Sequence, residues 1–327
     1  MMGAIWILAV SSFERDKSPD PPKILSAIIQ ITLVFFKPQD AKKINPSQPR
    51  KSPMTILNET ARLVKDKLAS EYESITVERV IIGMFFSGVK LSNGFGGLSY
   101  TPVKDIPRAV CCPSSAGRIF DPIKIYGMPA AEVLTALTSV EPIKAAVAIA
   151  TLNALSAVCW ERGLAEDYHI QMDTDALDAV RMPADCSVAV IGAFVPVLSK
   201  LKARGGRWWV IEQDPQTLKG DEMPHFIPAD QSGETITAAD VLIITGVTLV
   251  NHTLQPILAS ARSDAEIAVI GPTASLLPDA LFARGVRVVG GVRVKKPDEL
   301  LDVLAAGGSG YHFFDQLAPR IVIEKPA

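Results

Sequence analysis

The chain has 327 residues, of which 48% are hydrophobic and 21% are charged, and its 33 Lys+Arg and 35 Asp+Glu leave a net charge of −2. At about 150 residues per domain, this length suggests two domains. The composition is typical of a globular protein and excludes a disordered or fibrous one. The overall charge offers no basic field for phosphate groups, so nucleic acid is not an expected partner.

Residues 1–53 differ from the rest of the chain in charge, with 8 Lys+Arg and 4 Asp+Glu against 25 and 31 in the remainder. Their two apolar runs, 5–10 and 24–36, are shorter than the roughly 18–20 residues that span a bilayer. No basic stretch precedes the first run, as it would in a secretory signal. We therefore expect a disordered or dispensable extension before Met54, and no membrane partner.

The four cysteines Cys111, Cys112, Cys159 and Cys186 lack the two-pair spacing of a zinc site. So few cysteines in a chain this long indicate a reducing compartment, which predicts a cytoplasmic protein. The adjacent Cys111 and Cys112 could offer thiolates to a soft metal, although packing within a buried strand is the more common role of such a pair.

Residues 54–165 mix helices with short strands, which predicts a small α+β domain. Apolar residues at helical spacing follow Met54, and a Gly-rich turn at 93–97 separates strand-like runs. We expect an antiparallel meander with strands at 76–86, 89–92, 98–101 and 109–112, followed by helices at 129–138 and 142–162.

Residues 166–327 alternate strands with short helices, which predicts a Rossmann-like, doubly wound parallel sheet and an α/β fold class. The strand-like runs are rich in Val and Ile, as in strands buried on both faces. We expect strands at 187–191, 207–211, 241–244, 266–270 and 286–289. Helices are expected at 195–203, 253–261, 275–283 and 297–306.

Three loops that follow these strands, 192–196, 245–253 and 271–275, combine glycines, hydroxyls and an amide where a helix begins. Ligands of open parallel sheets bind at the carboxyl ends of the strands, and free N–H groups there suit anions. Turn formation and N-capping explain each loop singly, but three together favour a ligand crevice. The candidate binding residues are Gly192, Phe194, Thr245, Gly246, Asn251, Thr253, Gly271 and Thr273.

Glu212 ends the second strand, 20 residues after Gly192, where a Rossmann domain binds a ribose diol. The glycine series that admits a pyrophosphate is incomplete, because Phe194 stands where the second glycine belongs. Glu212 is therefore predicted as a carboxylate ligand of something other than ribose, including a metal ion. A nucleoside cofactor such as S-adenosylmethionine, in an enzyme, is the alternative.

Asn153 lies within an otherwise apolar helix, so its amide needs a polar partner if it is buried. Either it bonds to a neighbouring backbone group, or it points into a cleft and binds the ligand. The glycines at 94–97 are likewise either a tight turn or a flap over that cleft. For Asn251 we expect contact with the ligand, because Thr248 could cap the same turn.

The motifs IGAFVP at 191–196, EQDP at 212–215, TGVTLVNHTL at 245–254 and GPTAS at 271–275 together resemble the family known as "putative heavy-metal chelation". The resemblance extends from about Met54 to the C-terminus. It implies a first domain similar to the N-terminal domain of enolase, a Rossmann-like second domain and a site in the cleft between them. Enolase chemistry is not implied, because the barrel that carries it is absent from the resemblance.

The sequence and the resemblance together predict a protein that binds a small anionic ligand or a metal chelate between its two domains. Asn153 and the Rossmann-side loops would line the site, and Glu212 would supply a carboxylate to a divalent or heavy metal ion. Whether a reaction is catalysed, and whether the chain forms a homo-oligomer, the sequence leaves open.

Overall fold

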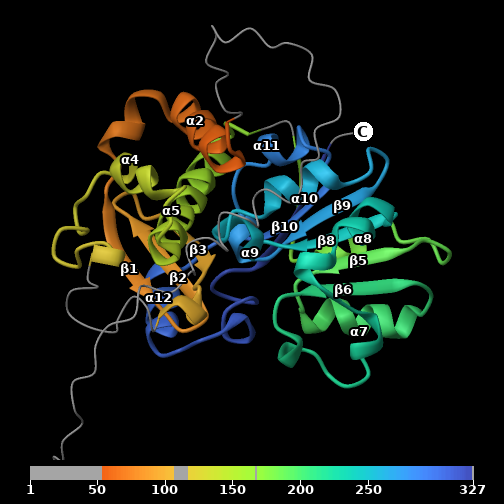
Figure 1. Ribbon diagram of the computed structural model, residues 1–327. Coiled ribbons are helices and arrows are strands. Elements are labelled where there is room, and N and C mark those ends of the chain that lie inside the picture. The colour runs from red at the N-terminus through yellow and green to blue at the C-terminus, as the bar shows by residue number, and fades with distance from the viewer. Residues whose placement is uncertain (1–53, 107–116, 166–167, 326–327) are drawn as a thin grey trace, which may run out of the picture. The chain divides into compact units, whose positions relative to one another are not determined.

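The first half of the fold contains a three-stranded antiparallel meander, whereas the sequence predicts a meander of four strands, and the expected strand at 76–86 is interrupted at 83–85 (Figure 1). The computed structural model describes residues 54–106, 117–165 and 168–325, and Pro53–Ala327 form one unit. The strands, in sheet order, are β1 (Val77–Ile82), β2 (Phe86–Leu91) and β3 (Gly96–Tyr100). The strand expected at 109–112 lies outside the described residues.

Two helices far apart in the sequence cover the two faces of this meander (Figure 1). On one face, α5 (Pro142–Glu161) approaches so closely that a Cβ on Gly97 would lie 2.1 Å from the Ala150 carbonyl oxygen. On the other face lies α12 (Pro297–Ala305), against which a Cβ on Gly88 would clash. Gly97 is therefore a packing position within β3.

The apolar character of α5 reflects its place in the core. By length and composition it could cross a membrane, but 94% of its most apolar stretch is buried inside the fold. Its neighbours include α2 (Ile56–Leu68), which Thr55 caps, and α4 (Ala130–Val133). The helix predicted at 129–138 is thus shorter, because a 3₁₀ turn at Leu134–Ala136 follows α4.

The second half is built on an eight-stranded sheet that is mostly parallel, which makes the fold mixed α/β. The sheet order is β4-β11-β10-β9-β8-β5-β6-β7. The sequence predicts five of these strands and a wholly parallel sheet, whereas β11 runs antiparallel to both neighbours. The strands are β4 (His169–Met172), β5 (Val188–Ile191), β6 (Trp208–Glu212), β7 (Phe226–Pro228), β8 (Val241–Thr245), β9 (Glu266–Ile270), β10 (Val288–Val292) and β11 (Arg320–Glu324).

Both faces of the large sheet are buried, which explains the Val- and Ile-rich strands. Alternate residues of β5 belong to different apolar clusters: Val188 and Val190 pack with α7, and Ala189 and Ile191 lie in the cluster that includes α10. The covering helices are α6 (Ala176–Ala179), α7 (Val195–Arg204), α8 (Gly233–Ala238), α9 (Val247–Val250), α10 (Leu254–Ser260) and α11 (Asp279–Phe282). The helix expected at 275–283 is shortened to α11.

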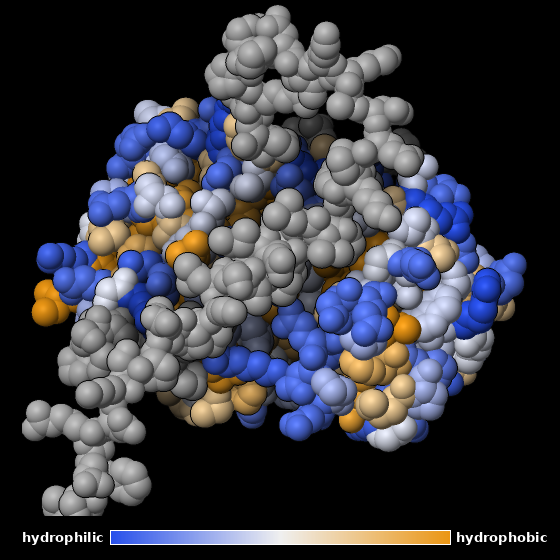
Figure 2. Space-filling view, in the orientation of Figure 1, coloured by the Kyte–Doolittle hydropathy of each residue, from blue (hydrophilic) through white to orange (hydrophobic). Residues whose placement is uncertain are grey.

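Hydrophilic side chains lie over α2 on the face seen in Figure 2.

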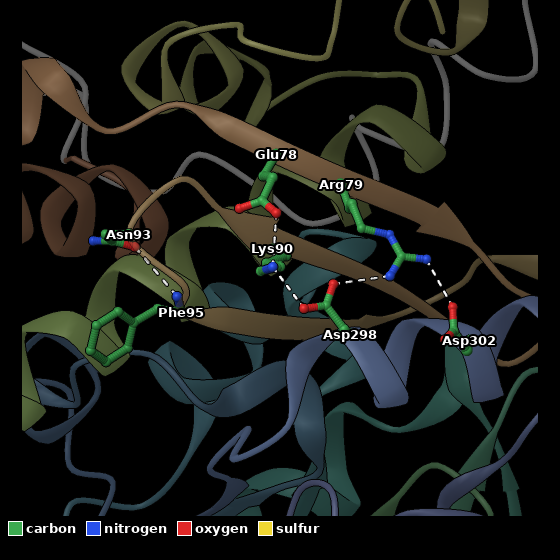
Figure 3. A network of polar contacts seen from close by, with 7 residues as sticks. All are labelled: Glu78, Arg79, Lys90, Asn93, Phe95, Asp298 and Asp302. Atoms are coloured by element: carbon green, nitrogen blue, oxygen red, sulfur yellow. Dashed lines mark hydrogen bonds and ion pairs between the residues drawn. The ribbon is translucent and has the colours of Figure 1, made fainter.

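Charged side chains join α12 to the meander (Figure 3). The Asp298 carboxylate accepts from Arg79 at 3.0 Å and from Lys90 at 2.7 Å. Arg79 also donates to Asp302, and Lys90 to Glu78. One carboxylate on α12 therefore holds both β1 and β2.

Candidate functional site

A cavity of about 350 Å³ lies at the carboxyl ends of the parallel strands, where ligands of open α/β sheets bind. We call it the site cavity. Most of its walls are apolar, and glycines bring the backbone close to it. It is lined by Phe86, Tyr100, Thr174, Asp175, Ala176, Leu177, Phe194, Pro196, Val197, Thr245, Gly246, Val247, Ile270, Gly271, Pro272, Thr273, Gly290, Gly291, Val292, Ser309, Gly310, Tyr311, Phe314, Arg320 and Ile321.

The meander contributes two of these lining residues, Phe86 from β2 and Tyr100 from β3. The Tyr100 backbone N–H donates to the Thr273 hydroxyl at 2.9 Å. This bond ties the end of β3 to the loop after β9, so the first and second halves of the fold share one wall of the site cavity.

Five of the predicted site residues line the site cavity: Phe194, Thr245, Gly246, Gly271 and Thr273. Their glycine N–H groups are already engaged, because Gly246 donates to the Ile270 carbonyl and Gly271 to the Gly290 carbonyl, both at 2.8 Å. These two groups therefore extend the hydrogen bonding between neighbouring parallel strands and do not present free donors to an anion.

Asn153 is absent from the lining and holds the walls in place instead. Its side chain is 2% exposed. The amide nitrogen donates to the Leu98 carbonyl at 2.7 Å and to the Thr273 carbonyl at 3.0 Å. Of the two roles that the sequence left open for this residue, the structure shows bonding to neighbouring backbone groups.

Glu212 is also absent from the lining, because its carboxylate turns back onto the chain. One oxygen accepts from the Ala193 N–H at 3.0 Å, and the other from the Gln213 N–H at 2.7 Å. The carboxylate thereby fixes the turn that follows β5. Gly192 lies in the same turn, where its φ of 97° suits glycine.

Asn251 and Thr253 lie outside the site cavity lining, on the exposed turn between α9 and α10. The Asn251 side-chain oxygen accepts from the Thr253 N–H at 3.2 Å and from the Thr253 hydroxyl at 2.6 Å. Thr248 is buried, and its hydroxyl donates to the Thr245 carbonyl. The two residues therefore organise this turn, and Thr248 does not replace Asn251 there.

Sequence reasoning missed the residues that β4 and β11 bring to the site cavity. Thr174 and Asp175 follow β4, and Arg320 begins β11. Tyr311 and Phe314 come from the segment before β11. A run of β-branched residues at 321–323, bounded by Pro319 and Pro326, is the sequence signal that could have located β11.

The fit of a protein-bound metal to these residues is poor. Within residues 54–106, 117–165 and 168–325, no group of three or more His, Cys, Asp or Glu side chains could hold a metal ion. Burial raises the pKa of the Cys159 thiol to about 11 and also raises the pKa of Cys186, which disfavours the thiolates that soft metals require. Glu212, the predicted metal ligand, bonds to backbone N–H groups. Cys111 and Cys112 fall outside the described residues.

Known proteins resemble this chain in sequence and in fold. Residues 65–156 and residues 175–323 match two family models, both described as "Putative heavy-metal chelation". An uncharacterized protein from Methanocaldococcus jannaschii is 22% identical over 187 residues, which are 56% of this chain and 67% of that protein.

Two crystal structures of proteins with unknown function share the fold. The one from Pyrococcus horikoshii has a TM-score of 0.64 at 19% identity and covers 83% of this chain and 100% of its own. The one from Desulfitobacterium hafniense has a TM-score of 0.61 at 17% identity, over 81% of this chain and 98% of its own. Along both halves of its folded unit, the chain thus matches the families described as "Putative heavy-metal chelation".

Proposed function

We propose that the protein binds a small organic ligand in the site cavity, and that any heavy or divalent metal arrives as cargo within a chelate of that ligand. The observation that carries the proposal is an apolar cavity of about 350 Å³ at the carboxyl ends of the strands, a size and place typical of small-molecule sites. The family description suggests the metal. The ligand's own atoms would hold it, because the described residues lack a metal-binding group.

We also infer the finer assignment of the two halves. Counted from β5, the six parallel strands follow the order 3-2-1-4-5-6, which is the order of dinucleotide-binding Rossmann folds. This order supports a Rossmann-like domain at 166–327. The meander with its helices is proposed as an enolase N-terminal-like domain at 54–165, and a cytoplasmic location remains part of the proposal.

Calorimetry on the full chain tests the ligand proposal. Divalent metal salts, salicylate and their mixtures would each be titrated into the native protein. Substituting Thr174, a half-buried lining residue, by tryptophan would fill the cavity, whereas Thr174→Ala is the matched control. We expect heat with salicylate or its metal complexes, lost in Thr174→Trp and kept in Thr174→Ala. Heat from the metal salts alone, unchanged in Thr174→Trp, would contradict the proposal.

A nucleoside cofactor is the second candidate, favoured by the position of the site cavity where the strand order reverses between β5 and β8. Its expected ribose ligand, Glu212, is engaged by backbone groups, and Phe194 occupies the cavity wall. A thermal-shift screen with S-adenosylmethionine and other nucleosides separates the candidates, since a ligand at 100 times its Kd stabilises a protein by about 2.7 kcal/mol. A shift with nucleosides alone would favour the enzyme.

A further inference from the structure

Arg320 places a cation at the wall of a cavity that is otherwise mainly apolar. Arg320 begins β11, and β11 pairs antiparallel with β10, so that Arg320 lies opposite Val292 at the end of β10. The first residue of β11 therefore reaches the same edge at which the parallel strands end. The reversed direction of one strand brings a guanidinium to the ligand edge of the sheet.

A series of aromatic rings lies beside this guanidinium. The Arg320 guanidinium carbon lies 4.7 Å from the centre of the Phe314 ring. Phe314 packs edge-on against Phe313, at 5.0 Å between ring centres, and Phe313 packs in the same way against Phe86 at 5.5 Å. Phe313 is only 1% exposed, so the series is anchored in the core.

Gly310 makes room for this arrangement. A Cβ at Gly310 would come within 2.4 Å of the Phe314 ring, and larger residues there would push the ring away. A guanidinium stacked on an aromatic face keeps its in-plane N–H groups available for hydrogen bonds. The Arg320 guanidinium thus lies over the Phe314 ring, and within residues 54–106, 117–165 and 168–325 it donates no side-chain hydrogen bond.

The charge of Arg320 has no counterpart among the residues that the structure describes. None of the ion pairs within that part of the chain involves Arg320. The acidic residue in the lining, Asp175, caps α6, and its side chain accepts from the Leu177 N–H at 3.0 Å. A guanidinium at the wall of a mainly apolar cavity, without an ion-pair partner among the described residues, is the arrangement expected of an anion-recognition residue.

We propose that Arg320 recognises the carboxylate of the ligand, and that the ligand is an organic acid in which this carboxylate is attached to an apolar ring. The proposal rests on the proposed function and names its ligand class. A planar carboxylate whose oxygens hold no metal can accept two parallel bonds from a guanidinium edge, while the ring would lie among the apolar side chains. Inorganic phosphate has no apolar body to fill the site cavity and should compete poorly.

The test compares salicylate with salicylamide, its neutral analogue, on the full chain by calorimetry or ligand-observed NMR. Charge-assisted hydrogen bonds are about twice as strong as neutral ones, and Arg320 is exposed to screening by solvent. We therefore expect the native protein to prefer salicylate by about tenfold. Arg320→Met should abolish this preference without weakening salicylamide binding.

Two further variants sharpen the test. Arg207→Met is the matched control, because Arg207 is an exposed arginine directly before β6, at the opposite edge of the sheet, and should behave like the native protein. Arg320→Lys should keep only part of the preference, because an ammonium lacks the planar fork. If Arg320→Lys preferred salicylate over salicylamide as strongly as the native protein does, the two-bond arrangement would be overturned.

The remaining outcomes separate this inference from the proposed function. Binding of both compounds with equal affinity, or an unchanged preference in Arg320→Met, would overturn the role of Arg320 while leaving a ligand-binding cavity. Binding of neither compound to a folded native protein would contradict both. Circular dichroism and the Tm of each variant show that it is folded.

Discussion

Glu212 illustrates how one carboxylate can be structural at a position where related folds bind a ligand. Its two oxygens accept from the Ala193 and Gln213 N–H groups. In Glu212→Gln, the amide nitrogen would face one of these donors, so we expect a loss of about 1–2 kcal/mol of stability. Urea unfolding measures the loss, and a nucleoside thermal-shift screen runs beside it. Unchanged stability, combined with the loss of a nucleoside shift seen in the native protein, would instead make Glu212 a ribose ligand.

Asn251 offers a second separation of scaffold from site at the level of one residue. Its side-chain oxygen accepts from the Thr253 N–H and hydroxyl, and a carboxylate oxygen can accept the same bonds. We therefore expect Asn251→Asp to keep its Tm within about 2 °C and its affinity for salicylate. A marked fall in affinity with an unchanged Tm would return Asn251 to the site, as the sequence alone suggests.

Strand direction explains which elements the sequence could predict and which parts of the site it could not. The central strands are buried on both faces, so continuous apolar runs in the sequence predict them. These strands are β5, β6, β8, β9 and β10. The predicted strand at 286–289 ends before Gly290 and Gly291, which belong to β10 in the structure. A Cβ on Gly290 would in fact lie 2.5 Å from that of Ala176, which makes this glycine a point of close packing.

Strand direction also explains why the sequence did not predict some residues of the site cavity. Inspecting the residues after each parallel strand finds Phe194, Thr245 and Gly271, all of which line the site cavity. It cannot find Arg320, which is the first residue of an antiparallel strand. The same inspection selects Glu212 because it lies at the ligand edge of the sheet, although its side chain bonds to nearby backbone groups.

The contact between α12 and the meander carries a prediction on pH. Hydrogen bonds from Lys90 and Arg79 hold the pKa of Asp298 below its ordinary value of 3.8. A carboxylate with a lowered folded-state pKa stabilises the fold above its unfolded pKa, and this contribution is lost as the pH falls through the folded value. Asp298→Asn should therefore lower the Tm modestly at pH 7 and flatten its decline below about pH 4.

The matched control for this element is Asp264→Asn. Hydrogen bonds from Arg262 also lower the pKa of Asp264. Arg262, however, is only two residues away in the same loop, so this pair joins no separate elements. High salt should reduce the difference in Tm between the native protein and Asp298→Asn, because salt screens exposed ion pairs. Equal Tm values for native protein and Asp298→Asn from about pH 3 to about pH 7, a range that includes the ordinary pKa of Asp, would remove the contact from the stability of the fold.

At the scale of the whole molecule, we predict that residues 54–327 suffice for the fold and for ligand binding. The helix α2 begins with its own cap, because the Thr55 hydroxyl accepts from the Asn58 N–H at 3.2 Å. Pro53–Ala327 also form a unit of their own. A chain starting at Met54 should keep its Tm within about 2 °C and its salicylate affinity. A larger fall would assign residues 1–53 a part in the fold.

Residues 54–165 and 166–327 are predicted to be two domains, yet α12 from the second covers a face of the meander in the first. A fragment of residues 54–165 would expose the Gly88 face that packs on Leu301 and Leu304, and Asp298 would be missing from Lys90. We expect this fragment to lack a cooperative thermal transition, whereas the intact chain shows a single one. Mixing it with a fragment of residues 166–327 should restore the transition, because the α12 contact needs no covalent link. If calorimetry showed cooperative unfolding of the isolated fragment, the two halves would instead fold independently.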